Sequence, residues 1–156
     1  MRFQNFHIWR GRLPHWRADE VTYFVTFRHR RPLDSKERLV LYQSLMRPEG
    51  RKLDYVVLLV LPEKTEMLFK VREAPTGLPF ELSDIIESAK TKAGRKIVKL
   101  TEERFPPFYI ESYDRIIRDE GELQERFDSL LAEPVDLELC EEPEEFQTLY
   151  VAGAPD

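Results

Sequence analysis

The order of apolar and polar positions along the chain first predicts three strands. Residues 21–27 are β-branched or aromatic throughout, which favours a strand. The continuously apolar run 55–61 is typical of a central strand that is covered on both faces. Residues 65–71 alternate between apolar and polar side chains. Because only a short turn with Pro62 separates the last two runs, we expect them to form a hairpin.

Helical spacing marks the segments between and after these strands. Asp34 stands three residues before Glu37, close to a capping box, and predicts a helix that ends near Met46. Ser83 is the expected N-cap of a second helix. Apolar residues recur at helical spacing along this second helix as far as Leu100, and we expect them to face the core.

The last third of the chain completes the predicted fold. Residues 105–110 are aromatic and interrupted by prolines, which predicts a short edge strand. A last helix begins with acidic residues after Asp119 and is expected to end at Pro134. The order β-α-β-β-α-β-α predicts an α+β protein: a ferredoxin-like β-α-β-β-α-β sheet with helices on one face, plus a C-terminal helix and an acidic tail. We place the domain at residues 1–134 and the tail at residues 135–156.

Composition and charge narrow the class of protein. A hydrophobic content of 42% excludes a largely disordered chain of 156 residues. Residues 1–53 contain 12 basic and 5 acidic residues, a net charge of +7, whereas residues 119–156 contain 1 basic and 13 acidic residues, a net charge of −12. The basic part can hold an anion, and the acidic part can keep the chain solvated or lie over the basic surface.

Apolar runs and cysteine content indicate where in the cell the protein is expected. The longest apolar run, 56–61, is too short to span a bilayer, so we expect no membrane partner. The first residues lack the apolar stretch of a secretory signal. The only cysteine, Cys140, cannot form an internal disulfide, which favours a reducing, cytoplasmic location.

Several short strings occur in a characteristic order between about residues 10 and 148. They are Leu13-Pro14-His15-Trp16 followed by residues 23–28, then residues 82–90, 112–119, 133–135 and 142–146. In this order and spacing they resemble the REP-associated single-tyrosine transposases of the HUH endonuclease class, which have an IS200-like transposase fold. The resemblance implies a ferredoxin-like fold, in agreement with the order of elements above.

The resemblance also implies an activity. Members of this family cut and rejoin single-stranded DNA next to short hairpins, and their nucleophilic tyrosine becomes joined to the 5′ end of the DNA. Tyr113 occupies that nucleophile position. A divalent metal, Mg²⁺ or Mn²⁺, held by a His-hydrophobic-His motif polarises the phosphate in the family. Family members are monomers or homodimers, and the sequence leaves this choice open.

The metal motif is replaced in this chain. Lys64 and Glu66 stand at the two histidine positions, with Thr65 between them. A charged ammonium has no lone pair with which to ligate a metal, although a carboxylate can supply oxygen to Mg²⁺ or Mn²⁺. We therefore expect a Lys64–Glu66 surface ion pair and no metal or other cofactor. A replacement carboxylate site made of Glu63, Glu66 and Asp114 is the alternative.

Basic residues mixed with aromatic ones are the candidates for DNA contacts. Those around the first strand are Arg10, Arg12, His15, Trp16, Arg17, Arg28, Arg30 and Arg31. A polar stripe on the second helix consists of Lys92, Arg95, Lys96 and Lys99. Arg115, beside Tyr113, is a further phosphate contact. Ordinary solvated surface residues are the alternative for these groups, and an aromatic side chain packed at a helix start is the alternative for Tyr113.

Three functions remain open from the sequence. The favoured one is a transposase-like protein that binds single-stranded or hairpin DNA but has lost metal-dependent cleavage. The second is an active tyrosine DNA strand-transferase with altered metal ligands. The third is a repurposed protein-interaction module, which the acidic end of the chain favours.

Overall fold

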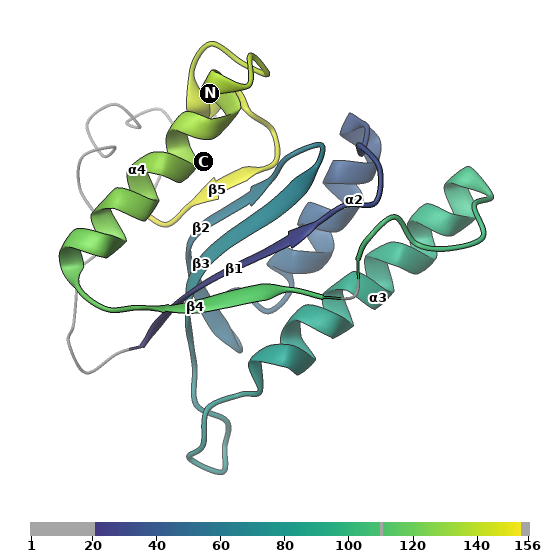
Figure 1. Ribbon diagram of the computed structural model, residues 1–156. Coiled ribbons are helices and arrows are strands. Elements are labelled where there is room, and N and C mark those ends of the chain that lie inside the picture. The colour runs from purple at the N-terminus through teal and green to yellow at the C-terminus, as the bar shows by residue number, and fades with distance from the viewer. Residues whose placement is uncertain (1–20, 110, 154–156) are drawn as a thin grey trace.

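The protein is an α+β fold built on one antiparallel sheet. The computed structural model describes residues 21–109 and 111–153. Five strands pair in the order β4-β1-β3-β2-β5, and the first four positions give the ferredoxin-like arrangement (Figure 1). The strands are β1 (Thr22–Arg28), β2 (Leu53–Val60), β3 (Lys64–Val71), β4 (Tyr113–Ile117) and β5 (Leu149–Val151).

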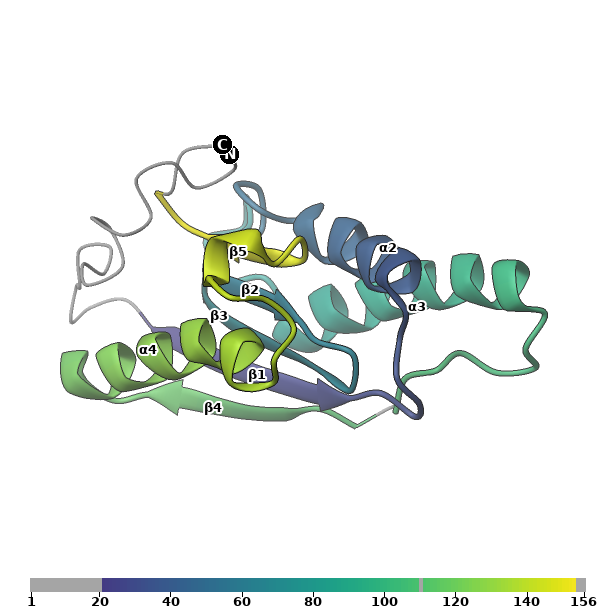
Figure 2. The same ribbon diagram turned by 90° about the horizontal axis from the view of Figure 1, so that it is seen from above.

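Helices cover both faces of the sheet. The helices α2 (Ser35–Met46) and α3 (Leu82–Thr101) lie on one face, as expected. The helix α4 (Glu120–Asp136) lies on the opposite face and is followed by a short 3₁₀ helix, η1 (Pro143–Glu145). Figure 2 shows this division between the two sides of the sheet. Among the described residues, no helix combines the length and the apolar character that crossing a membrane requires.

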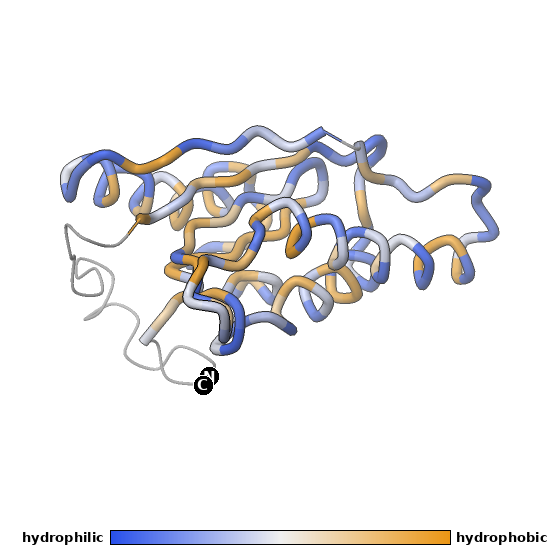
Figure 3. Tube along the Cα trace, turned by 90° about the horizontal axis from the view of Figure 1, so that it is seen from below, coloured by the Kyte–Doolittle hydropathy of each residue, from blue (hydrophilic) through white to orange (hydrophobic). Residues whose placement is uncertain are grey.

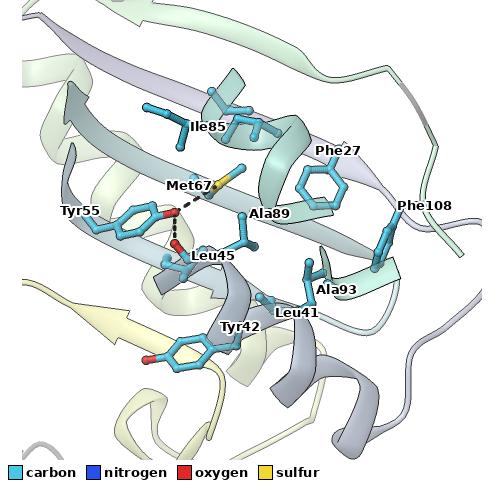
Figure 4. Packing of buried hydrophobic residues seen from close by; sticks show 14 of the residues in the cluster. Phe27, Leu41, Tyr42, Leu45, Tyr55, Met67, Ile85, Ala89, Ala93 and Phe108 are labelled. Carbon is cyan, nitrogen blue, oxygen red and sulfur yellow. Dashed lines mark hydrogen bonds between the residues drawn. The ribbon is translucent and has the colours of Figure 1, made fainter. Parts of the chain in front are cut away.

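The larger core lies between the sheet and the helices α2 and α3. Ala89 and Ala93 on α3 are buried, and these small side chains let the helix approach α2 closely (Figure 4). The Tyr55 hydroxyl is buried as well and donates a hydrogen bond of 2.8 Å to the Leu45 carbonyl, so its polar atom is satisfied. Burial raises the pKa of Tyr55.

The second core lies under α4 and draws on the last described residues. Phe127 on α4 and Phe24 on β1 are buried there together with Phe146 and Leu149. In Figure 3 hydrophobic and hydrophilic positions alternate every few residues along the helices, as expected of helices with one buried side. Part of the segment expected as an acidic tail is thus folded, since Leu149 pairs with Leu59 of β2.

The expected helix boundaries are partly confirmed. The capping box is present: Asp34 accepts from the Glu37 amide at 2.8 Å, and Glu37 accepts from the Asp34 amide at 3.0 Å. The N-cap of α3 is Glu81, so the expectation of Ser83 is wrong by two residues. Leu100 is exposed, because the buried stripe of α3 ends at Ile97.

Two expectations about the last third of the chain are wrong. The described part of the expected edge strand, residues 105–109, is not a strand; within it only Phe108 makes an isolated bridge, to His29, because the flanking prolines have no amide to donate. The edge strand is β4 instead. Pro134 does not end α4, since it lies in the last turn, where only one backbone hydrogen bond is lost, and its ring is buried.

Candidate functional site

A cavity of about 890 Å³ opens on the face of the sheet that carries α4. Its wall combines apolar side chains from β1, the β2–β3 turn and the segment after α4 with charged side chains and one phenol. The polar and charged residues are Thr26, Arg28, Glu63, Lys64, Glu66, Tyr113, Arg126 and Glu133. The cavity therefore brings together Lys64 and Glu66, at the expected metal positions, and Tyr113, the candidate nucleophile.

The strand register explains why these residues meet. Thr26 on β1 pairs with Glu66 on β3 and with Tyr113 on β4. Residues directly opposite one another share a face of the sheet, and strands lie about 4.8 Å apart, so the Cα atoms of Glu66 and Tyr113 are roughly 10 Å apart. Lys64 is two residues before Glu66 and points to the same face. Tyr113 is 58% exposed and lies on a strand, so it is not an aromatic residue packed at a helix start.

Lys64 is held by two carboxyl groups. Its Nζ lies 3.4 Å from Oε1 of Glu66, which gives the expected ion pair, and 2.5 Å from Oε1 of Glu133 on α4. The pair is not a surface pair, because the Glu66 side chain is only 8% exposed. Burial alone would lower the pKa of Lys64, but the hydrogen bond to Glu133 and the charges of both glutamates raise it. Lys64 is therefore an ammonium group at neutral pH.

Glu66 and Glu133 are in different protonation states at neutral pH. Burial, followed by the hydrogen bond and the negative charge of Glu133, raises the pKa of Glu66 to about 8. Burial would also raise the pKa of Glu133, but its hydrogen bonds to Glu66 and Lys64 outweigh burial and lower it. These opposite shifts favour a proton on Glu66 in its hydrogen bond with Glu133, and a negative charge on Glu133 beside Lys64.

The residues at this position do not fit a divalent metal. The ammonium of Lys64 occupies the space between the two carboxyl groups and would repel a cation. Glu66 is largely neutral at pH 7, and a metal binds the deprotonated form. Asp114 is not available as a replacement ligand: it pairs with Val25 and lines a different pocket beside α3, on the other face of the sheet. In the described ranges no group of three or more His, Cys, Asp or Glu residues converges on a metal position.

His29 holds the turn that presents Lys64. Its Nδ1 lies 2.8 Å from the Pro62 carbonyl and its Nε2 lies 2.8 Å from Oγ1 of Thr65. Because a carbonyl oxygen only accepts, Nδ1 carries the proton and Nε2 accepts from the Thr65 hydroxyl. Burial lowers the pKa of His29 to about 4 despite the bond to Pro62, so the ring is neutral at pH 7. His29 is therefore a packed structural residue.

Two charged residues of the cavity were not singled out as site residues from the sequence. Arg126 on α4 lies over the Phe24 ring, with its Cζ 4.1 Å from the ring centroid. Glu133 binds Lys64. A signal for Arg126 was present, since it is the single basic residue among residues 119–156. Nothing in the local sequence connects Glu133 to Lys64, because they meet only when α4 packs on the sheet.

The basic residues that the sequence offered as DNA contacts do not form one surface. Arg28 lines the cavity, whereas Arg30 lies over the Phe105 ring at 5.9 Å. Arg31 is bound by Glu37 and Glu103, and Arg115 is bound by Glu122 at 3.1 Å. The α3 stripe is exposed but on the sheet face opposite the cavity, and it comprises Lys92, Arg95, Lys96 and Lys99. Five candidates lie outside the described residues: Arg10, Arg12, His15, Trp16 and Arg17.

Comparison with known proteins supports the fold. No protein-family model and no curated protein sequence matches the chain. A solved structure of a REP-associated tyrosine transposase bound to a REP hairpin is similar to this chain, with a TM-score of 0.65 and 14% sequence identity over 88% of this chain and 82% of that one. A candidate transposase from Deinococcus radiodurans R1 has a TM-score of 0.47 and 12% identity over 72% of this chain and 91% of that one. The chain has an IS200-like transposase fold, which confirms the fold that the resemblance implied.

The buried carboxyl of Glu66 predicts a pH-dependent stability. Its pKa rises on folding to about 8, so its stabilising contribution is complete below the unfolded value near 4.5 and is lost as the pH rises through 8. Glu66→Gln keeps a neutral hydrogen-bonding group. We expect this variant to gain on the order of 4 kcal/mol relative to the wild type between pH 5 and pH 9, because about three pH units of the interval between the two pKa values fall in this range and one pKa unit corresponds to about 1.4 kcal/mol.

Urea unfolding at pH 5, 7 and 9 measures this difference. Glu63→Gln, at an exposed position of the same cavity, is the matched control and should show no such trend. A stability difference between wild type and Glu66→Gln that is constant over this pH range would contradict a raised pKa.

Restoring the two histidines should create a metal site. Residues 64 and 66 point to one face of β3, so the double variant Lys64→His, Glu66→His places two imidazoles side by side and removes the ammonium. We expect it to bind Mn²⁺ or Zn²⁺ at least about tenfold more tightly than the wild type in calorimetry at pH 7.5. Lys70→His, farther along β3, is the control. No gain in metal uptake would mean that the two side chains do not share the geometry described.

Proposed function

We propose that this protein binds DNA hairpins with single-stranded flanks and does not cut DNA by a metal-dependent reaction. The observation that carries this proposal is the ammonium of Lys64, held by Glu66 and Glu133 in the same cavity as Tyr113. Tyr113 lines the same cavity as residues 64 and 66 of β3, where the family resemblance places the metal ligands. In this chain those two residues form an ion cluster with Glu133 and do not form a metal site.

The ion cluster is a poor substitute for a metal. A bound divalent ion stabilises the charge that develops on a phosphate in the transition state by several kcal/mol. The positive charge of Lys64 is already neutralised by the Glu133 carboxylate at 2.5 Å, so little of it is left for a phosphate. A phenol without such support is a weak nucleophile.

The rest of the cavity suits nucleic acid. Arg28 and Arg126 reach it from β1 and α4, and the planar guanidinium group binds phosphate oxygens with two hydrogen bonds. The exposed ring of Tyr113 offers a surface on which an unpaired base can stack. The solved transposase with the same fold is bound to a REP hairpin, which supports DNA as the partner.

Strand transfer by Tyr113 is the second candidate function. The exposure of its phenol within the cavity favours it, because a nucleophile must be reached by the phosphodiester. In such a reaction the tyrosine oxygen would lose its proton and bond to phosphorus while the bond from phosphorus to the 3′ oxygen of the neighbouring nucleotide breaks, and that oxygen would take up a proton and leave as a 3′ hydroxyl.

The DNA proposal predicts a measurable affinity. We expect a hairpin with single-stranded flanks to bind at micromolar protein or below in 100 mM salt, in a fluorescence anisotropy titration. The double variant Arg28→Gln, Arg126→Gln should weaken binding at least about tenfold through loss of charge-assisted phosphate contacts. Arg72→Gln is the control, because Arg72 is paired with Asp54 at 2.7 Å and lies outside the cavity. Absence of binding by the wild type would contradict the proposal.

Denaturing gels separate the two candidate functions. With labelled hairpin DNA and Mg²⁺ or Mn²⁺, we expect no covalent protein–DNA adduct and no cleaved product from the wild type. An adduct that forms with the wild type and disappears in Tyr113→Phe would establish strand transfer and overturn the loss of cleavage.

A further inference from the structure

A smaller cavity with a basic lining, called the basic hollow below, lies on the opposite side of the sheet from the Tyr113 cavity. It has a volume of about 160 Å³ and is formed where the end of α2 and the following loop meet α3. Four cationic side chains line it: Arg47, Arg51, Lys52 and Lys92. Among the described residues no carboxylate lines it, although the chain as a whole carries a net charge of −5.

The cations of this hollow have few partners inside the protein. In the part of the chain that the structure describes, none of Arg47, Arg51 and Lys92 takes part in an ion pair. The acidic residues of the same loop are engaged elsewhere: Glu49 accepts from the Tyr55 amide at 2.7 Å, and Asp54 pairs with Arg72. Positive charges gathered in this way repel one another, and an external anion would relieve the repulsion.

Hydrogen bonds fix the backbone beneath the hollow. The Arg51 and Lys52 amides both donate to the Pro48 carbonyl, at 3.0 and 2.9 Å, and Gly50 adopts a positive φ of 76° that closes the turn. The Ser44 hydroxyl donates to the Ala89 carbonyl at 2.9 Å and joins α2 to α3 under the hollow. The backbone positions of Arg47, Arg51 and Lys52 are therefore fixed by hydrogen bonds.

The hollow continues into the α3 stripe. Lys92 belongs to both, and Lys96 and Lys99 follow it at spacings of four and seven residues along the same helix face. From Lys92 to Lys99 the helix rises about 10 Å, and a DNA strand in a duplex carries one phosphate about every 3.4 Å of axis, so the stripe spans about three phosphates. Spaced negative charges match this surface better than a single small anion does.

We propose that this hollow and the α3 stripe form a second binding site, which takes phosphate groups of a nucleic-acid backbone. The inference rests on the proposed DNA-binding function and deepens it: one nucleic acid contacts both faces of the protein, its unpaired part at the Tyr113 cavity and its backbone at α3. Because the site reads only phosphates, it adds affinity and salt dependence without sequence preference.

A salt-dependence experiment tests the second site. In anisotropy titrations between 50 and 200 mM salt, we expect the triple variant Arg47→Gln, Arg51→Gln, Lys92→Gln to weaken hairpin binding at least about tenfold for every DNA sequence. The slope of log K against log salt should fall by about two to three, one for each lost phosphate contact. Arg118→Gln is the control, because Arg118 is paired with Glu122 at 3.0 Å away from the hollow.

A second measurement keeps the two proposals distinguishable. Inorganic phosphate added to the ¹⁵N-labelled protein should shift the amide signals of Arg51, Ser88 and Lys92 in the wild type and not in the triple variant. Wild-type DNA binding with an unchanged salt slope in the folded triple variant would overturn the second site alone. No DNA binding by the wild type would overturn both proposals, and phosphate shifts in that case would identify a site for small anions only.

Discussion

The arrangement of the Tyr113 cavity depends on one ammonium group, Lys64, held between the carboxyl groups of Glu66 and Glu133. The Lys64 side chain is partly buried, which alone would lower its pKa, but the hydrogen bond to Glu133 and the charges of both glutamates raise it. Burial first, and then the hydrogen bond and negative charge of Glu133, raise the pKa of Glu66, while Lys64 lowers it by a smaller amount. The charges of the cluster are balanced within the protein, although Oε1 of Glu66 is buried without a hydrogen-bond partner among the described residues.

The fold brings this cluster together from three separate parts of the chain. Strand β3 supplies Lys64 and Glu66, α4 supplies Glu133, and β4 supplies Tyr113 beside them. His29 fixes the turn between β2 and β3 by bonding to Pro62 and Thr65, on either side of Lys64. The apolar contacts of Phe127 and its neighbours hold α4 on the sheet and so keep Glu133 within reach. Packing on one face of the sheet thus determines the charge state of the cavity.

The sequence predicted the fold where short-range patterns dominate. The hairpin of β2 and β3, the capping box of α2 and the ion pair of Lys64 with Glu66 follow from neighbouring residues, and the structure confirms them. The edge strand was misplaced because the aromatic residues before Tyr113 suggested a strand, whereas prolines prevent one there. Glu133 and the basic loop at Arg47 and Arg51 were missed for another reason: their partners are distant in sequence, and only the packing of α4 and α3 reveals them.

The most direct test of the central interaction is paramagnetic relaxation by Mn²⁺ in NMR spectra of the wild-type protein at pH 7. If Lys64 and its two glutamates form a closed ion cluster, sub-millimolar Mn²⁺ should leave the amide signals of Thr65, Glu66 and Tyr113 no broader than those of the rest of the protein. Selective broadening of these three signals, removed by a chelator, would place a cation among them and contradict the account.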